Sequence, residues 1–162
     1  MTGGVVESAA ARYQAQGGVV GRPVNAFRRE IRFTVLAHAG DAAWYKYSAT
    51  PGQIGASVIE GHLDSEQGPA VFFRLGALHP GDTVDVTLAN GVTAVFRVTG
   101  VRQYLKSRFP AKTVYHTARF AGLRLITCGG AFDYATSQYL SSIVVFAFLV
   151  ESLPAGHHKA AT

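Results

Sequence analysis

The chain has 162 residues, of which 48% are hydrophobic and 15% are charged, so it is large enough for one domain with a substantial core and is not a disordered chain. Its formal net charge is +5, but Lys and Arg are scattered singly apart from Arg28-Arg29, and this pattern does not predict nucleic-acid binding. One cysteine excludes an internal disulfide and a cysteine-based zinc site, and His116 and His157-His158 lack the spacing of metal ligands, so we expect no metal and no cofactor.

The ends of the chain carry weaker signals than its middle. Residues 1–26 hold paired glycines and an Ala-rich stretch with a weak helix signal, and we expect a loosely ordered arm. Residues 153–162 are small and polar and are expected to form a flexible tail. We expect residues 27–152 to form the folded domain. No run of about 18 apolar residues predicts a membrane span, so we expect the chain as given to be soluble, and we expect a monomer.

The first strand signals come in the second quarter of the chain. Residues 31–36 alternate apolar and polar side chains, as a strand does, and residues 41–47 lead into a turn at Pro51-Gly52. Residues 56–61 are apolar enough for a buried strand, which ends at His62.

A short helix or turn and a hairpin follow. Residues 69–78 carry apolar side chains at helical spacing over too short a length for a long helix. Residues 83–89 alternate, Asn90-Gly91 supplies a favoured two-residue turn, and residues 92–101 alternate back. We expect this hairpin to act as scaffold only.

Two more strands are expected over residues 123–128 and 143–150, separated by a loop from Gly129 to Ser142. Many strands with turn signals between them, and no long helices, predict a mainly β fold, either a barrel or a sandwich.

Cys128 is the strongest candidate for a chemical group. It ends an apolar strand pattern that stops in two glycines, which leaves its side chain at a rim, and His62 closes another strand in the same way. Two strand ends are therefore expected to bring a thiol and an imidazole together. An imidazolium beside a thiol favours the thiolate, which is the start of nucleophilic catalysis. The alternative for each residue is an ordinary place in the core.

Short motifs in the sequence resemble those of sortases, the cysteine transpeptidases of Gram-positive cell surfaces, and most closely those of the actinobacterial class F (class E/F) group. The resemblance implies a sortase-like closed β-barrel of about seven or eight strands with short helices. In order, the matching words are Trp44-Tyr45, Pro51-Gly52, Gly61-His62-Leu63-Asp64-Ser65, Gly68 through Leu75, Pro80-Gly81-Asp82, Phe109-Pro110, Val114-Tyr115, Leu123 through Gly130, and Phe132-Asp133.

The resemblance also implies an activity. Cys128 would attack a threonine-like carbonyl in a Leu-Pro-x-Thr-Gly (LPxTG-like) sorting signal, with His62 as acid and base, and the acyl group would pass to an amine such as a peptidoglycan precursor, or to water. It implies a place at the extracellular face of the cell membrane, with the membrane anchor missing from this chain. An L,D-type transpeptidase is disfavoured because its Ser-His-Gly-Cys word is absent. The main alternative is a catalytically weakened barrel that binds a peptide or a partner.

Sortases use an arginine as third group, about a dozen residues after the cysteine, and residues 129–162 contain no arginine. Strand parity puts Arg124 on the same side as Cys128, so we predict that Arg124 supplies this catalytic function. The alternative is an outward arginine paired with a carboxylate. Arg74 and Arg108 are further candidates.

Four residues are predicted to contact substrate. Asp64 lies two residues after His62 and is expected on the same side, although a turn-capping aspartate is the alternative. Tyr134 and Tyr139 lie on a glycine-led loop and are expected to grip an apolar peptide residue, unless they cap the core. Ser142 stands near the position at which the family's arginine is expected.

Overall fold

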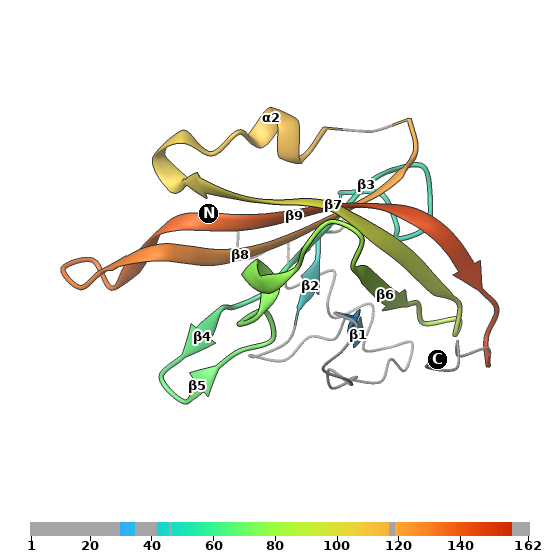
Figure 1. Ribbon diagram of the computed structural model, residues 1–162, viewed down its shortest axis with the longest axis horizontal. Helices are drawn as coiled ribbons and strands as arrows, with labels where there is room; N and C mark the ends of the chain where they lie inside the picture. Colours follow the sequence, from blue (N-terminus) through green and yellow to red (C-terminus); the bar gives the residue numbers. More distant parts are fainter. Residues whose placement is uncertain (1–29, 35–41, 46, 117–118, 157–162) are drawn as a thin grey trace.

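A computed structural model describes residues 30–34, 42–45, 47–116 and 119–156 of the chain. Within these residues a seven-stranded sheet with the order β1-β6-β7-β9-β8-β3-β2 curls into a half-barrel (Figure 1). The prediction of a mainly β fold is confirmed, and in the described residues β1 and β2 form the two ends of the sheet order.

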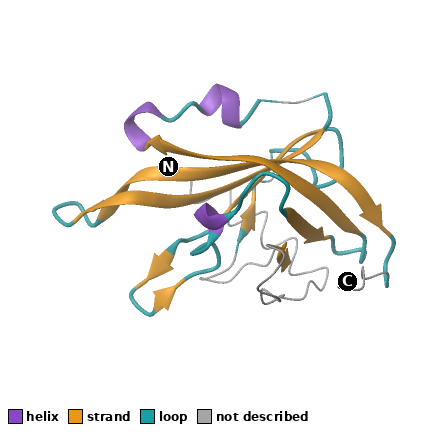
Figure 2. Cartoon of the chain, in the orientation of Figure 1, coloured by secondary structure: helices purple, strands orange, loops and turns teal. Residues whose placement is uncertain are grey.

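Strands make up most of the described chain, with three single-turn helices between them (Figure 2). A separate two-stranded sheet, β4 with β5, lies beyond the edge of the main sheet in Figure 1. The elements are β1 (Glu30–Thr34), β2 (Ala43–Trp44), β3 (Gly55–Glu60), β4 (Asp64–Ser65), β5 (Gly68–Pro69), η1 (Leu75–Ala77), β6 (Thr83–Thr87), β7 (Thr93–Leu105), η2 (Lys106–Arg108), α2 (Ala111–Val114), β8 (Ala121–Asp133) and β9 (Gln138–Leu153).

Several expected elements are present within a residue or two of their predicted bounds. The strand expected over 31–36 is β1, parallel to β6, and the buried strand expected over 56–61 is β3. The short helix or turn expected over 69–78 is a run of turns followed by η1. The arm over 1–26 and most of the tail lie outside the described residues. No helix in the described ranges is long and apolar enough to cross a membrane.

The turn of the β6–β7 hairpin differs from the prediction. The Leu88 N–H donates to the Val92 carbonyl oxygen at 2.8 Å, which leaves a loop of three residues, Ala89 to Gly91, in place of a two-residue turn. Gly91 takes a φ of +82°, a left-handed conformation that closes three-residue loops and that other residues rarely adopt. The prediction placed the glycine correctly and counted the loop one residue too short.

The loop expected from Gly129 to Ser142 is mostly strand, so that prediction is wrong. β8 continues to Asp133 and β9 begins at Gln138, and the long hairpin projects from one end of the sheet (Figure 1). The pairing slips between Gly129 and Phe132, where Gly130 takes a φ of +76°. The two glycines therefore make a bulge inside the hairpin and do not end the strand.

The inner surface of the curled sheet holds the main hydrophobic core. Alternate side chains of β8 and β9, such as Leu123, Leu125 and Val145, are completely buried there. Phe72 and Leu75, from the turns around η1, pack into the same cluster. The strands that carry the predicted site residues thus have one face fixed by the core.

The outer face of β3, β8 and β9 carries a second, smaller cluster. Val58, Ile126 and Val144 pack there against Val114 of α2, and all four are buried. The η2–α2 segment therefore covers the middle of this outer face, on the opposite side of the sheet from the core (Figure 1).

Candidate active site

Cys128 lies on the outer face of β8, half-buried and with a free thiol. It pairs directly with Ser142 of β9, which in turn pairs with Tyr104 of β7. Directly opposed residues project from the same face of a sheet, so the Cys128 thiol, the Ser142 hydroxyl and the Tyr104 ring form one row across three strands.

His62 continues this row on the other side of Cys128. β3 runs parallel to β8, their last paired residues are Glu60 and Ile126, and the Gly61 N–H donates to the Ile126 carbonyl oxygen at 3.0 Å. His62 and Cys128 are the next matching positions on the two neighbouring strands. The chain that leaves the end of β3 therefore brings the exposed His62 to the level of Cys128, which lies within β8.

The segment that carries His62 is held by the turns that follow it. The Phe72 N–H donates to the His62 carbonyl oxygen and the Ala70 N–H to the Leu63 carbonyl oxygen, each at 3.0 Å. A Cβ on Gly61 would lie 2.7 Å from Cδ2 of the buried Phe72 ring, so only glycine fits before His62. The backbone of His62 is thereby fixed against the core.

Two of the predicted substrate-binding residues contact each other. The Tyr139 hydroxyl donates a short hydrogen bond to Oδ2 of Asp64, which joins the β8–β9 hairpin to the His62 segment. This bond to Asp64 raises the pKa of Tyr139, with smaller contributions from desolvation and from the charges of Asp64, Cys128 and Tyr134. Tyr139 therefore lies within the electrostatic reach of the Cys128 thiol.

Aromatic rings line the hairpin beyond Cys128. The Phe132 ring contacts Tyr134 and Tyr139 edge to face, with centroids 5.1 and 5.0 Å apart. Tyr134 is 87% exposed, so it does not cap the core. The three rings therefore form a short aromatic cluster on the hairpin that follows Cys128.

The glycines after Cys128 allow close packing of the two strands. A Cβ on Gly129 would lie 2.6 Å from Cδ1 of Ile143, and one on Gly130 would lie 2.8 Å from Oγ of Ser141. A side chain at either position would push β9 away from β8 and move Ser142 relative to Cys128.

Arg124 stands four residues before Cys128 on β8, which is about 13 Å along a strand. Its Nη1 donates to the Leu123 carbonyl oxygen at 3.0 Å, and its guanidinium carbon lies 4.7 Å from the centroid of the Phe146 ring. Nη1 also lies 3.3 Å from the place of a Cβ on Gly122, so the guanidinium is directed away from Cys128. The catalytic role of Arg124 stays a prediction from strand parity.

Sequence reasoning assigned no role to the aromatic cover over this face. Tyr115, just after α2, donates a hydrogen bond to Oε1 of Glu60 at 3.1 Å, and its ring contacts Tyr45 and Phe109. Burial raises the pKa of Tyr115 most, and the charge and hydrogen bond of Glu60 raise it further. The sequence motifs Phe109-Pro110 and Val114-Tyr115 were the signal from which this aromatic cover could have been found.

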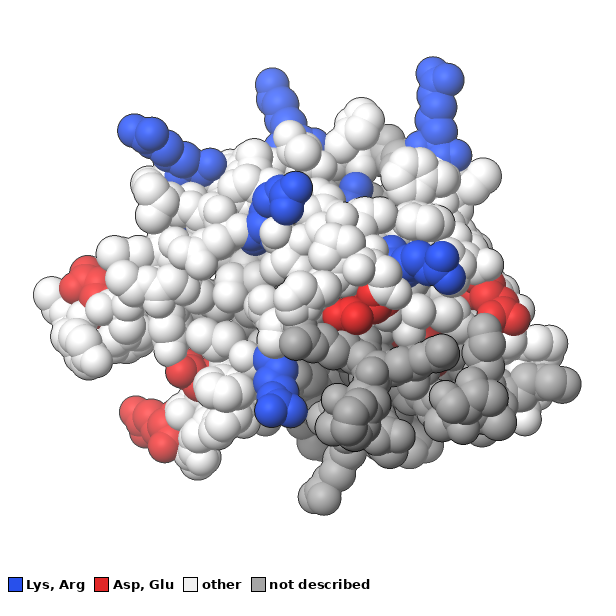
Figure 3. Space-filling view, in the orientation of Figure 1, with Lys and Arg blue, Asp and Glu red and all other residues white. Residues whose placement is uncertain are grey.

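Charged side chains are scattered over the face shown in Figure 3. Lys and Arg side chains project separately from the η2–α2 side and also lie lower on this face, and Asp and Glu appear near β4, at the end of the hairpin and at the opposite end of the molecule. In the described part of the chain no three His, Cys, Asp or Glu residues stand together as metal ligands do.

The comparisons with known proteins agree with this geometry. The sequence matches the family described as Sortase domain over residues 22–150, and the chain belongs to the sortase family. A search of curated proteins gave no match.

Solved sortases share the fold at low sequence identity. The SrtA sortase from Actinomyces oris superposes with a TM-score of 0.58 and 20% identity, over 75% of this chain and 71% of that one. Sortase A from Listeria monocytogenes superposes with a TM-score of 0.56 and 17% identity, over 75% of this chain and 78% of that one. A lid mutant of sortase A from Corynebacterium diphtheriae superposes with a TM-score of 0.56 and 21% identity, over 74% of this chain and 62% of that one.

Proposed function

We propose that the chain is a cysteine transpeptidase that cleaves an LPxTG-like sorting signal through a thioacyl intermediate and transfers the acyl group to an amine. The observation that carries the proposal is the parallel pairing of β3 and β8, which sets His62 and Cys128 at matching positions on neighbouring strands. Membership of the sortase family supports the same reaction class.

In the first half-reaction the Cys128 thiolate attacks the carbonyl carbon of the threonine-like residue. A C–S bond forms, the C–N bond to the next residue breaks, and protonated His62 gives its proton to the departing amine. In the second half-reaction an amine attacks the thioester, His62 takes the proton, and the Cys128 sulfur leaves as thiolate. Water in place of the amine gives hydrolysis.

Substrate contacts are proposed for the residues that surround the thiol. Ser142 is on the same face in the same row, and its hydroxyl is a donor for the peptide or the developing oxyanion. Tyr134 and Tyr139 offer ring faces to an apolar side chain, and Asp64 is the acceptor that fixes Tyr139. Arg124 is left out of this assignment because its guanidinium is directed toward Gly122.

The wider setting is proposed from the family. We place the chain in the class E/F group because of its ordered words, and at the extracellular face of the cell membrane, with a sorting-signal protein as substrate and a peptidoglycan precursor as amine. Residues 27–152 are proposed as the catalytic domain, with an arm over 1–26 and a tail over 153–162.

A second candidate function is a weakened sortase-like domain that binds a peptide without cleaving it. The observation that favours this function is the absence of an arginine from residues 129–162, together with the direction of the Arg124 guanidinium. An amine-dependent product separates the two functions.

The test is a cleavage assay over a panel of five-residue sorting motifs, with and without an amine acceptor. We expect a mass increase on Cys128 from the acyl group, and a transfer product that appears only with the amine. Cys128→Ala should abolish both, and His62→Ala should remove nearly all turnover, at unchanged circular dichroism and melting. Cleavage that persists in Cys128→Ala refutes the proposal, and peptide binding by the wild type without any acyl adduct selects the second candidate.

A further inference from the structure

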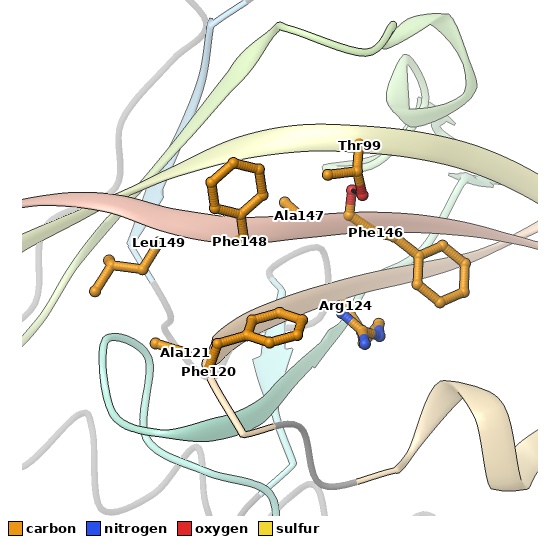
Figure 4. A pocket seen from close by; sticks show the side chains of 8 residues that line it. All are labelled: Thr99, Phe120, Ala121, Arg124, Phe146, Ala147, Phe148 and Leu149. Carbon is orange, nitrogen blue, oxygen red and sulfur yellow. Dashed lines mark hydrogen bonds between the residues drawn. The ribbon is translucent and has the colours of Figure 1, made fainter.

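A cavity of about 630 Å³ lies on the outer face of β8 and β9, at the end of these strands away from the hairpin. Figure 4 shows three phenylalanine rings and one arginine around it. Its size is within the usual range of small-molecule sites. The residues that line it are Thr99, Phe120, Ala121, Arg124, Phe146, Ala147, Phe148 and Leu149. We call it the Arg124 cavity.

Arg124 is the one charged residue in this lining, and it is 92% buried, because only 8% of its surface is exposed. Its Nε is buried and has no hydrogen-bond partner, its Nη1 bonds to the carbonyl oxygen of its own neighbour Leu123, and its guanidinium carbon lies 4.7 Å from the centroid of the Phe146 ring. Within the described residues no carboxylate pairs with it, and desolvation by burial lowers its pKa. A buried cation without a counter-ion is unfavourable, so an anion that enters the cavity is stabilised there.

The rest of the lining is apolar and partly open. Phe120 is 54% exposed and Phe148 is 37% exposed, so both rings present apolar surface at this face. The Thr99 hydroxyl already donates to the Phe146 carbonyl oxygen at 3.0 Å, so the lining offers little besides Arg124 for a polar group.

Glycine at position 122 allows Arg124 and Phe120 to pack close to the strand. A Cβ on Gly122 would lie 3.3 Å from Nη1 of Arg124 and 3.4 Å from the Phe120 ring. The guanidinium and the ring therefore flank one point beside the strand. A charged group and an apolar wall stand together, which is the arrangement that an amphipathic molecule requires.

We propose that the Arg124 cavity binds a medium-chain fatty-acid carboxylate. A single guanidinium matches one planar monoanion, because its parallel N–H groups fit a carboxylate. The alkyl chain then covers the exposed rings of Phe120 and Phe148, beside the partly buried ring of Phe146. Neither a bare inorganic anion nor a neutral alkane uses both halves of this lining.

This site is separate from the one around Cys128. Val114 and its neighbours cover the outer face between them, and the Arg124 guanidinium is directed to the far side. The proposal therefore does not depend on the peptide chemistry proposed for Cys128.

The experiment measures binding of decanoate to the full chain by calorimetry, below the concentration at which decanoate forms micelles. Decanol and decyltrimethylammonium, with the same chain and a neutral or cationic head, are the ligand controls. We expect saturable binding of one decanoate per chain, and binding of both controls weaker by about tenfold or more, because each lacks a charge-assisted hydrogen bond. Equal affinity for decanol, or no saturation, overturns the proposal.

Two variants locate the site. Arg124→Met keeps an unbranched, though shorter, side chain and removes its charge, and it should weaken decanoate binding by about tenfold or more. Arg102→Met is the matched control, because exposed Arg102 makes the same bond to its preceding carbonyl but does not line the cavity. Phe120→Ala, at an exposed ring, should also weaken binding and tests the site if Arg124→Met fails to fold. Equal loss in Arg102→Met, or unchanged binding in Phe120→Ala, contradicts the assignment.

Discussion

Tyr139 donates its phenolic proton to Asp64, and this single hydrogen bond joins the hairpin beyond Cys128 to the segment that carries His62. The two residues are 75 positions apart in the sequence. Because Asp64 follows His62 by two residues and Tyr139 lies near Cys128, the bond holds the thiol side and the imidazole side of the site at a fixed separation.

Tyr139→Phe removes this bond and keeps the ring. We expect kcat for the sorting peptide to fall by about tenfold, because small misplacements of reacting groups are costly, while KM changes little. Tyr134→Phe is the matched control, since Tyr134 is an exposed ring on the same hairpin. A fall in melting temperature with normal kcat would show that the bond only stabilises the hairpin.

Alkaline pH should weaken the fold through Tyr115. Burial, then the charge of Glu60 and the hydrogen bond to it, raise the pKa of Tyr115 above its usual value of about 10. The protonated phenol is thus favoured in the folded state, so its contribution to stability is present below pH 10 and is lost as the pH rises through the folded-state pKa. The Tyr115→Phe variant should lose less stability than the wild type above about pH 10.

Urea unfolding at about pH 8 and about pH 11 measures this difference, since ΔG of unfolding is read at each pH. Tyr134→Phe is again the control and should follow the wild type. An equal loss of stability in the wild type and Tyr115→Phe between the two pH values would show that the pKa of Tyr115 is not raised in the folded state.

Tyr134→Ala should raise KM for the sorting peptide several-fold with little change in melting temperature. The ring is 87% exposed and contacts only Phe132 among the described aromatic residues, so the fold loses little by its removal. Initial rates over a range of peptide concentrations, with thermal melting alongside, make the measurement. Unaltered KM with a large drop in melting temperature would assign Tyr134 to the structure alone.

The mainly β class was predictable from the sequence because it follows from local patterns of alternation and turn residues. An apolar run that stops at a polar residue or at glycine indicates a strand end, and β3 follows this rule, since it ends at Glu60 shortly before His62, whereas β8 continues past Cys128 to Asp133. The sequence pattern did not specify that β3 and β8 are parallel neighbours, and this pairing is known from the structure.

Longer-range contacts escaped prediction for physical reasons. Nothing local in Tyr139 or Asp64 shows that they bond, because the contact depends on how the hairpin bends at Gly130. The extension of β8 to Asp133 was missed because two glycines usually end a strand, whereas here the first packs under Ile143 and the second forms a bulge. Tyr115 was missed because a helix of one turn has no periodicity.

Arg124→Lys tests whether Arg124 has the catalytic role that strand parity predicts, or whether the observed direction of its side chain excludes that role. An oxyanion donor lost at this position would lower kcat by about 10- to 1,000-fold, because lysine keeps the charge and loses the planar pair of donors. Since the guanidinium is directed toward Gly122 and lies over Phe146, we expect a steady-state rate within about threefold of the wild type. Arg74→Ala and Arg108→Ala, at two exposed arginines, are compared on the same peptide at equal folding. A large loss in Arg124→Lys alone would show that the side chain turns toward Cys128 when peptide binds, and a large loss in one of the other two would assign the third group to that arginine.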